Sequence, residues 1–230
     1  MKDYKIPNII DILLTLFASI LCGMGCGFIN FASLGMDAIG IFYDGIRNVL
    51  KLSPEQIGTA SYVVCFILSI FLLIVARKYV SIGSVIYILM YGFFANVGTV
   101  MWEHLISGDN LIIRILVASL GFLVLYIGLG IFIAVDIGVD AFTGVMLWIC
   151  DITKKDMKIV KPVCDIGLTI IGAVLGGTLG AFTFISIILG GICLSAITKQ
   201  FQKFYIKNIV IKRYNKGQNP EQTLKSDDED

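Results

Sequence analysis

Long apolar runs constrain this chain more than any other feature, because about 20 consecutive apolar residues are enough for a helix to cross a bilayer. Apolar residues make up 57% of the sequence and charged residues only 15%, against about 45–50% apolar in soluble domains. The sequence therefore predicts an all-α, polytopic membrane protein. Six runs have the length of a span, at residues 9–32, 57–76, 81–102, 111–135, 159–177 and 179–198.

Two shorter apolar segments follow the first and fourth runs. They are MDAIGIFYDGIRNVL at 36–50 and GVDAFTGVMLWIC at 138–150. At about 1.5 Å per residue, neither covers the roughly 30 Å of hydrocarbon in a bilayer. Segments of this length are better explained as re-entrant helices than as full spans. Directly after the first segment, SPEQ at 53–56 predicts a capping box that opens the second span.

The sequence also indicates an internal duplication. Five residues recur at a constant offset of 103, and the aspartate among them is a rare residue in apolar runs. Because each half has three full spans, an odd number, the second half must enter the membrane from the opposite side. We therefore expect two inverted repeats of three transmembrane helices plus one short re-entrant helix each, in residues 1–105 and 106–200. The recurring pairs are Gly25 and Gly128, Gly27 and Gly130, Gly35 and Gly138, Asp37 and Asp140, and Ala38 and Ala141.

An alternative with eight spans in two parallel repeats stays open, because the loop charges barely separate the two arrangements. Cytoplasmic loops carry an excess of Lys and Arg. With six spans and the amino terminus inside, most basic residues lie inside, and Arg47 and Lys51 lie outside. This predicts both termini in the cytoplasm. Residues 201–217 are expected to be a basic amphipathic segment, on an anionic leaflet or in solvent, and residues 218–230 a disordered acidic tail.

Two stretches resemble a known family. They are SLGMDAIGIFYDGI and DIGVDAFTGVMLWICDITKKDMKIVKPVCDIGLTIIG, and the second carries Asp140 and Asp165. Together they resemble the YczE/YyaS/YitT family of bacterial integral membrane proteins, over about residues 10–200. The tryptophan that precedes the aspartate in some members is replaced here by Met36 and Val139. The resemblance implies a multi-pass protein of the bacterial cell membrane and assigns no substrate.

Aspartates inside the apolar segments are the candidate binding residues. An ionisable residue within a span costs roughly 2.5–3.5 kcal/mol on insertion scales, so it usually faces a protein interior or a water-filled cavity. Asp37, Asp140 and Asp165 are therefore candidates for binding a ligand or ion. Asp44 lies seven residues after Asp37, on nearly the same helix face, and adds a fourth carboxylate. The structural alternative for Asp37 and Asp140 is that each caps a short helix.

Glycines and cysteines in the apolar runs favour structural roles. The glycines are expected at turns or close helix contacts. The six cysteines form no CxxC pair, and we interpret them as reduced, buried small residues. No metal or cofactor is expected. The glycines of this group are Gly25, Gly27, Gly35, Gly128, Gly130 and Gly138.

The remaining function classes are transport and assembly. The sequence contains no HExxH, GxSxG or P-loop motif and a single histidine, so it is not expected to encode an enzyme. The inverted repeats favour a secondary transporter or permease for a small solute or ion. The alternative is a non-catalytic membrane scaffold or assembly partner. The expected partners are the lipid bilayer and a solute or ion, with a homo-oligomer or a partner membrane protein left open. No basic stripe indicates nucleic acid.

Overall fold

The computed structural model describes residues 8–105 and 110–205, and this part of the chain is all-α. It contains eight α-helices and two short 3-10 helices. The predicted tail at 218–230 and most of the predicted amphipathic segment lie outside the described residues. The α-helices are α1 (Ile9–Ala32), α2 (Ala38–Val49), α3 (Ile57–Val75), α4 (Ile82–Leu105), α5 (Leu111–Val135), α6 (Ala141–Thr153), α7 (Met157–Val174) and α8 (Ala181–Tyr205), and the 3-10 helices are η1 (Pro54–Gln56) and η2 (Arg77–Tyr79).

Five of these helical segments are long and apolar enough to cross a membrane: α1, η1 with α3, α4, α5 and α8. By helix length and composition, the chain is therefore a multi-span membrane protein. The prediction of six spans exceeds this number. The run at 159–177 lies on α7, an 18-residue helix whose sequence includes Lys158, Lys161 and Asp165. These three charged residues separate α7 from the five apolar spans, which are also longer, at 22–25 residues.

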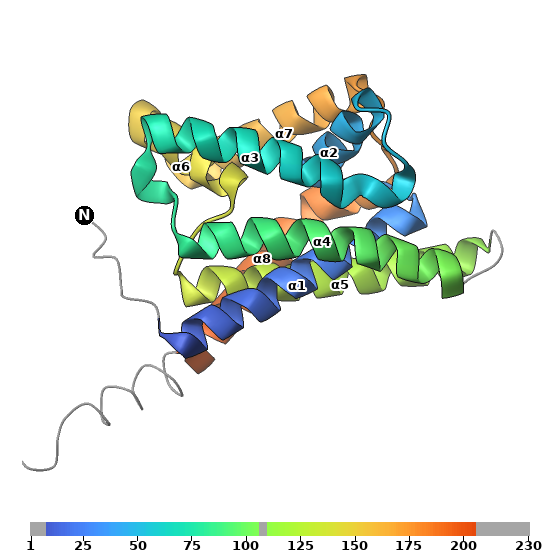
Figure 1. Cartoon of the computed structure of the whole chain (residues 1–230), viewed down its shortest axis with the longest axis horizontal. Coiled ribbons are helices and arrows are strands. Elements are labelled where there is room, and N and C mark those ends of the chain that lie inside the picture. The colour runs from blue at the N-terminus through green and yellow to red at the C-terminus, as the bar shows by residue number, and fades with distance from the viewer. Residues whose placement is uncertain (1–7, 106–109, 206–230) are drawn as a thin grey trace, which may run out of the picture.

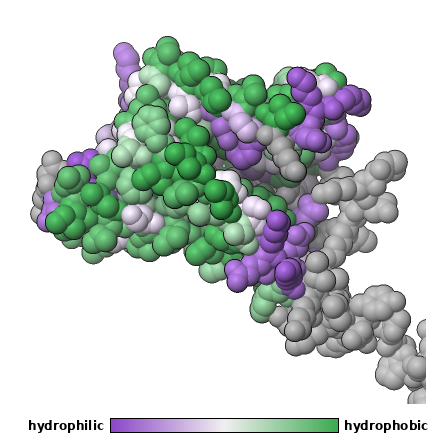
Figure 2. Space-filling view, turned by 180° about the vertical axis from the view of Figure 1, so that it is seen from behind, coloured by the Kyte–Doolittle hydropathy of each residue, from purple (hydrophilic) through white to green (hydrophobic). Residues whose placement is uncertain are grey.

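The helices form two layers (Figure 1). In the lower layer of that view, α1 packs against α4 and α5, and α5 packs against α8. In the upper layer, each of the short helices α2 and α6 packs against both α3 and α7. The two predicted short segments are thus separate helices of 12 and 13 residues. Seen from behind, apolar side chains cover most of the surface, and hydrophilic ones gather at the ends and between the layers (Figure 2).

Local signals explain where the helices begin. The capping box predicted at 53–56 is confirmed, since the backbone N–H of Ser53 donates to the Gln56 side chain at 3.1 Å. A second capping box opens α1, where the backbone N–H of Asn8 donates to Asp11 at 3.2 Å. Both boxes satisfy N–H groups that a helix start leaves without a partner.

Glycines allow a close helix crossing between α1 and α5. A Cβ atom built on Gly25 would lie 2.5 Å from the backbone nitrogen of Leu125, and one built on Gly128 would lie 2.8 Å from the carbonyl oxygen of Ala18. Gly27 and Gly130 approach α4 and α8 in the same way. Any larger residue would separate these helices, so glycine sets their distance.

Two extended connectors, 33–37 and 136–140, lead from the long helices α1 and α5 to the short ones. The carbonyl of Leu34 accepts a hydrogen bond from the backbone of Phe182 at 3.1 Å, at the start of α8. The carbonyl of Ile137 accepts one from the hydroxyl of Ser81 at 2.8 Å, next to the start of α4. Each connector is therefore held by the beginning of the last long helix of the other half.

Neither short helix takes the chain to the opposite end of the molecule. Asn30, near the end of α1, donates to the carbonyl of Pro54 at 2.8 Å, so the chain enters and leaves α2 at one end. At the other end, Asp151 of α6 accepts from the Tyr79 hydroxyl at 2.5 Å, close to the Ser81 contact of the second connector. The hydroxyl of Tyr205 donates to Asp11 at 2.5 Å, so the start of α1 and the end of α8 also lie together.

Candidate functional site

The first turn of α6 packs against the second turn of α2 inside the molecule. The ring centroids of Phe42 and Phe142 lie 5.8 Å apart, and those of Tyr43 and Phe142 lie 5.7 Å apart. Asp37 and Asp140 occupy the N-cap positions of α2 and α6. Each of these helix starts therefore combines a carboxylate with a helix N-terminus, which carries a partial positive charge.

The two N-cap aspartates differ in what their side chains do. The carboxylate of Asp140 accepts a hydrogen bond from the backbone N–H of Thr143 at 3.0 Å, as a capping residue does. Asp37 has the same extended backbone, and the backbone N–H of Gly40 lies near its carboxylate, but the two do not reach the geometry of a side-chain cap hydrogen bond. A Cβ atom built on Gly40 would lie 2.7 Å from Oδ1 of Asp37, so glycine leaves the space that this carboxylate occupies.

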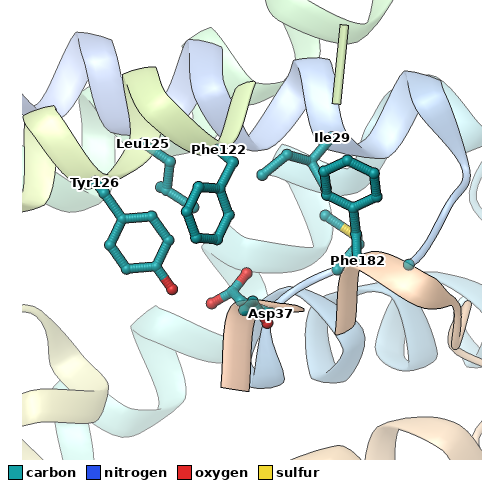
Figure 3. Close-up of a pocket in the computed structure, with 9 residues that line it drawn as sticks. Ile29, Asp37, Phe122, Leu125, Tyr126 and Phe182 are labelled. Atoms are coloured by element: carbon teal, nitrogen blue, oxygen red, sulfur yellow. The ribbon is translucent and has the colours of Figure 1, made fainter. Parts of the chain in front are cut away.

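The Asp37 carboxylate points into a pocket between α1, α5 and the start of α8 (Figure 3). The hydroxyl of Tyr126 points toward it, and the rings of Phe122 and Phe182 stand beside it. Ser186 of α8 completes the polar lining. The pocket leaves no room for a water molecule in this conformation. The arrangement is a partly buried carboxylate enclosed mainly by aromatic and aliphatic side chains.

An ion pair on α7 lies near this pocket. Lys161 donates to Asp165 at 2.7 Å, and their side chains are 41% and 25% exposed. The other carboxylate oxygen of Asp165 is buried without a hydrogen-bond partner among the described residues. Both charges of the pair act on the Asp37 carboxylate. A charged pair in an apolar helix indicates a polar interior on this side of α7.

Asp44 belongs to a different contact. Its side chain is 2% exposed and pairs with Arg47 through Nε and Nη2, both at 2.7 Å. Its second oxygen accepts from the backbone and hydroxyl of Thr178, at 2.7 Å and 2.8 Å. A carboxylate with about four acceptor positions is fully occupied by these partners. The structure thus places Asp44 as an anchor between α2 and the connector from α7 to α8, apart from the Asp37 pocket.

Buried tyrosines and cysteines close the interior on the Asp140 side. The Tyr43 hydroxyl and the Cys65 thiol lie 3.1 Å apart, and Tyr87 and Tyr91 stack with ring centroids 5.3 Å apart. Cys22 and Cys26 of α1 lie against Tyr87 and Tyr91, respectively. All six cysteines of the chain are free. This dense cluster leaves Asp140 as a capping residue within a packed core.

A larger pocket of about 420 Å³ lies in the upper layer, between α3 and α7 and over the meeting point of α2 and α6. Phe42, Phe142, Leu68 and Leu168 are among its lining residues, and no polar atom contributes to its surface. It offers no hydrogen bond or charge to a polar solute. Within residues 8–105 and 110–205, no three His, Cys, Asp or Glu side chains gather as a metal site would require.

Several residues of the Asp37 pocket were not among the sequence candidates. Tyr126 is the one hydroxyl-bearing aromatic residue in the run at 111–135, which was a usable signal. Lys161 lies four residues before Asp165, the spacing of a helical ion pair, and this spacing also pointed to the contact. Phe122, Phe182 and Ser186 gave no signal, because apolar and small residues are ordinary in a membrane helix.

Residues 9–199 match a family described as a family of unknown function (DUF6198), and the chain belongs to that family. The comparison with curated proteins found no match, and the comparison with solved structures found none either. The family description assigns no activity. The function must therefore be argued from the residues of the site.

Proposed function

We propose that the protein is a secondary transporter or permease for a small solute or ion, with its binding site in the Asp37 pocket, where α2 begins. One observation carries this proposal: Asp37, the N-cap residue of a short helix, faces an interior pocket between α1, α5 and α8, and a second short helix, α6, packs against α2. Secondary transporters place their sites near the bilayer midplane, at the ends of discontinuous helices from two inverted repeats. The proposed activity involves no covalent chemistry and no enzyme.

The contacts of the connectors support inverted repeats. Gly35 lies against Gly180, and Gly138 lies against Gly83, so each half supplies the same contact to the other. Gly35 and Gly138 are 103 residues apart in the sequence, and Gly83 and Gly180 are 97 residues apart. We propose that α7 serves as the sixth span, with the Lys161–Asp165 pair on the side that faces the Asp37 pocket.

The distribution of basic residues supports an orientation with both termini in the cytoplasm. Lys78 and Lys154 lie at the end of the molecule where α1 begins, whereas Arg47 and Lys51 lie at the opposite end. Cytoplasmic loops are enriched in Lys and Arg. The resemblance to the YczE/YyaS/YitT family supports a location in a bacterial cell membrane.

Alternating access is the transport mechanism that this geometry supports. The pocket at Asp37 is closed in the present conformation, so a solute enters only when helices separate. Contacts at both ends connect a short helix to the connector opposite it: Asp44 with Thr178 at one end, and Asp151 with Lys78 at the other. We propose that these contacts open in turn, which exposes the central carboxylate first to one side and then to the other.

A scaffold role is the second candidate, favoured by the apolar pocket of about 420 Å³ in the upper layer. A test that needs no known solute separates the two roles. The six native cysteines are replaced, and a single cysteine is introduced by Ser186→Cys in the Asp37 pocket. A membrane-impermeant methanethiosulfonate reagent is then applied to right-side-out and to inside-out vesicles.

A transporter predicts that the cysteine at position 186 reacts from both sides of the membrane, because the pocket opens to each in turn. The matched control is Ser19→Cys, a fully buried position on α1 away from this pocket, which should stay unreactive. Reaction at position 186 from one side only, or from neither, would contradict the transport proposal and favour the scaffold.

A further inference from the structure

The residues around Asp37 indicate which class of solute the pocket binds. Resting on the proposed transport function, we infer that this pocket binds an organic ammonium cation, with Asp37 as its counter-ion and the rings of Phe122, Tyr126 and Phe182 around its alkyl groups. The residues come from three separate parts of the chain, and all of them line one pocket (Figure 3).

The charge of the pocket favours a cation. When ionised, Asp37 contributes a full negative charge, and its carboxylate forms no cap hydrogen bond with α2. The start of α2 contributes only about half a positive charge. Lys161 and Asp165 form an ion pair without net charge, in which Lys161 acts more strongly on Asp37 than Asp165 does. The sum stays negative, so an entering cation neutralises a carboxylate that has no fixed counter-ion of its own within the pocket.

The lining distinguishes an organic cation from a metal ion. Hard inorganic cations need a shell of several oxygen ligands. Besides Asp37, the side chains of this pocket offer two oxygens, the hydroxyls of Tyr126 and Ser186, and the Ser186 hydroxyl already donates to the carbonyl of Thr183 at 2.9 Å. A sodium ion would be left with too few ligands here.

The aromatic rings supply what an alkylammonium ion binds. Phe122 and Tyr126 lie one turn apart on α5 with ring centroids separated by 4.4 Å, and Phe182 stands across the pocket on α8. Aromatic faces attract cations, and rings around a carboxylate are the arrangement that recognises alkylated ammonium groups. In the closed conformation the backbone N–H of Phe182 donates to the carbonyl of Leu34, which places the ring next to the connector that carries Asp37.

The wall that must move to admit the ligand is α8. Only 17% of its most apolar stretch is buried in the protein, against 39–56% for the other four candidate spans. Phe182 and Ser186 both lie in its first two turns. Movement of this end of α8 widens the pocket without disturbing the tight crossing between α1 and α5.

Thermal unfolding of the purified full chain in detergent tests the inference directly. The probes are tetramethylammonium chloride, sodium chloride at equal ionic strength, and tert-butanol as a neutral molecule of similar shape. We expect a saturable rise of the melting temperature with tetramethylammonium alone, because a ligand that binds the folded state stabilises it. An equal rise with sodium or with tert-butanol would overturn the inference.

Variants identify the residues that carry binding. Asp37→Asn should weaken tetramethylammonium binding at least about tenfold, since a charge-assisted contact is lost. Phe122→Leu should also weaken it, whereas Tyr126→Phe, which keeps the ring, should retain most of it. Asp140→Asn is the matched control and should bind as the native protein does. Unchanged binding in both Asp37→Asn and Phe122→Leu would refute the site, even if one variant folded poorly.

Cysteine labelling at position 186 tests transport, and the tetramethylammonium experiment tests the ligand class, so either can fail without the other. Labelling at position 186 from both sides without any response to tetramethylammonium would keep the transport proposal and reject the ligand class. A response that depends on Asp37 without labelling from both sides would keep the binding site and reject transport.

Discussion

Asp37 and Asp140 stand at the same place in their helices, at the end of equivalent connectors, yet only Asp140 caps its helix. The difference comes from what lies opposite each residue. Stacked tyrosines and thiols surround the region of Asp140, whereas Asp37 faces a pocket lined by Tyr126 and Phe182. Two N-cap aspartates 103 residues apart thus acquire different chemistry from the helices that face them.

The helices of the two parts of the chain also differ in how tightly they pack. In the first half α3 packs on α4, where Tyr62 donates to the carbonyl of Leu89 at 2.7 Å and Asn96 accepts from the backbone of Gly58 at 2.6 Å. In the second half α7 and α8 are not packed along each other over the described residues, and α7 carries the Lys161–Asp165 pair. A polar interior therefore has room to form beside Asp37 and none beside Asp140.

The largest difference between the two halves is expected at the contacts that hold their short helices. Asp44→Ala should lower the free energy of unfolding by about 3–5 kcal/mol, because it leaves the Arg47 guanidinium, whose side chain is only 12% exposed, without its partner. Asp151→Ala, at the contact of the other half, is the control and should cost far less, since that side chain is 45% exposed. Chemical denaturation in detergent measures both. Equal losses would contradict the difference between the two ends.

At the crossing of α1 and α5 the two halves should instead behave alike. Gly25→Ala and Gly128→Ala each place a methyl group within 3 Å of backbone atoms of the other helix. Overpacking of this kind costs about 1–3 kcal/mol. We expect similar drops in melting temperature for the two variants. Gly191→Ala, at a position with open space around it, should have no such effect.

Charge removal at the two N-cap positions sharpens the comparison further. Asp37→Asn should abolish solute-dependent activity, with binding weakened at least about tenfold, because the counter-ion is lost. Its free energy of unfolding should be unchanged or higher, since a partly buried charge without a cap hydrogen bond is removed. Asp140→Asn should keep both activity and stability. Loss of activity in Asp140→Asn alone would reverse the assignment of the two residues.

Capping should be detectable as a smaller effect on one helix only. Asp140→Ala removes the hydrogen bond to Thr143 and should cost about 1 kcal/mol, while Asp140→Asn retains the cap. Asp37→Ala should not destabilise the start of α2 in this way. Hydrogen exchange of the first turns of α6 and α2 measures the difference. Equal protection losses in the two alanine variants would show that Asp37 caps as well.

The smallest effect is expected at the exposed contact between Lys78 and Asp151. The hydrogen bond to Lys78 lowers the pKa of Asp151 below its ordinary value of 3.8, and the hydrogen bond to Asp151 raises the pKa of Lys78 above 10.5. The contribution of Asp151 is present above its unfolded pKa and disappears as the pH falls through the lowered pKa. The contribution of Lys78 disappears as the pH rises through the raised pKa. Between these limits this contact should make stability flat with pH. Lys78→Gln should remove the alkaline edge and reduce the acidic one, because the Tyr79 hydroxyl still donates to Asp151 and also lowers its pKa.

Much of the local structure could be predicted because its causes are local. The short segments predicted at 36–50 and 138–150 are the helices Ala38–Val49 and Ala141–Thr153, since interruptions by glycine and aspartate limit their length. The capping box at Ser53 and Gln56 depends on residues three positions apart. The number of spans was less predictable, because hydrophobicity over 159–177 did not weigh the charged residues that α7 carries.

The candidate site was predicted only in part. Asp37 and Asp140 were selected because aspartate is costly in an apolar run, and the structure places each at the N-cap of a short helix. Asp44 shares a helix with Asp37, but its partner Thr178 comes from a distant connector and makes it an anchor. Helix periodicity places residues on a face and carries no information about which distant helix will cover that face.

The sequence by itself determined the membrane setting, the position and length of the short helices, and the glycines at which helices approach closely. These depend on hydrophobicity, chain length and backbone sterics, which act over a few consecutive residues. Only the tertiary structure decided that Asp140 caps a helix and Asp37 faces a pocket. That choice depends on Tyr126, Phe182 and Ser186, which α5 and α8 bring to Asp37 and to no equivalent place beside Asp140.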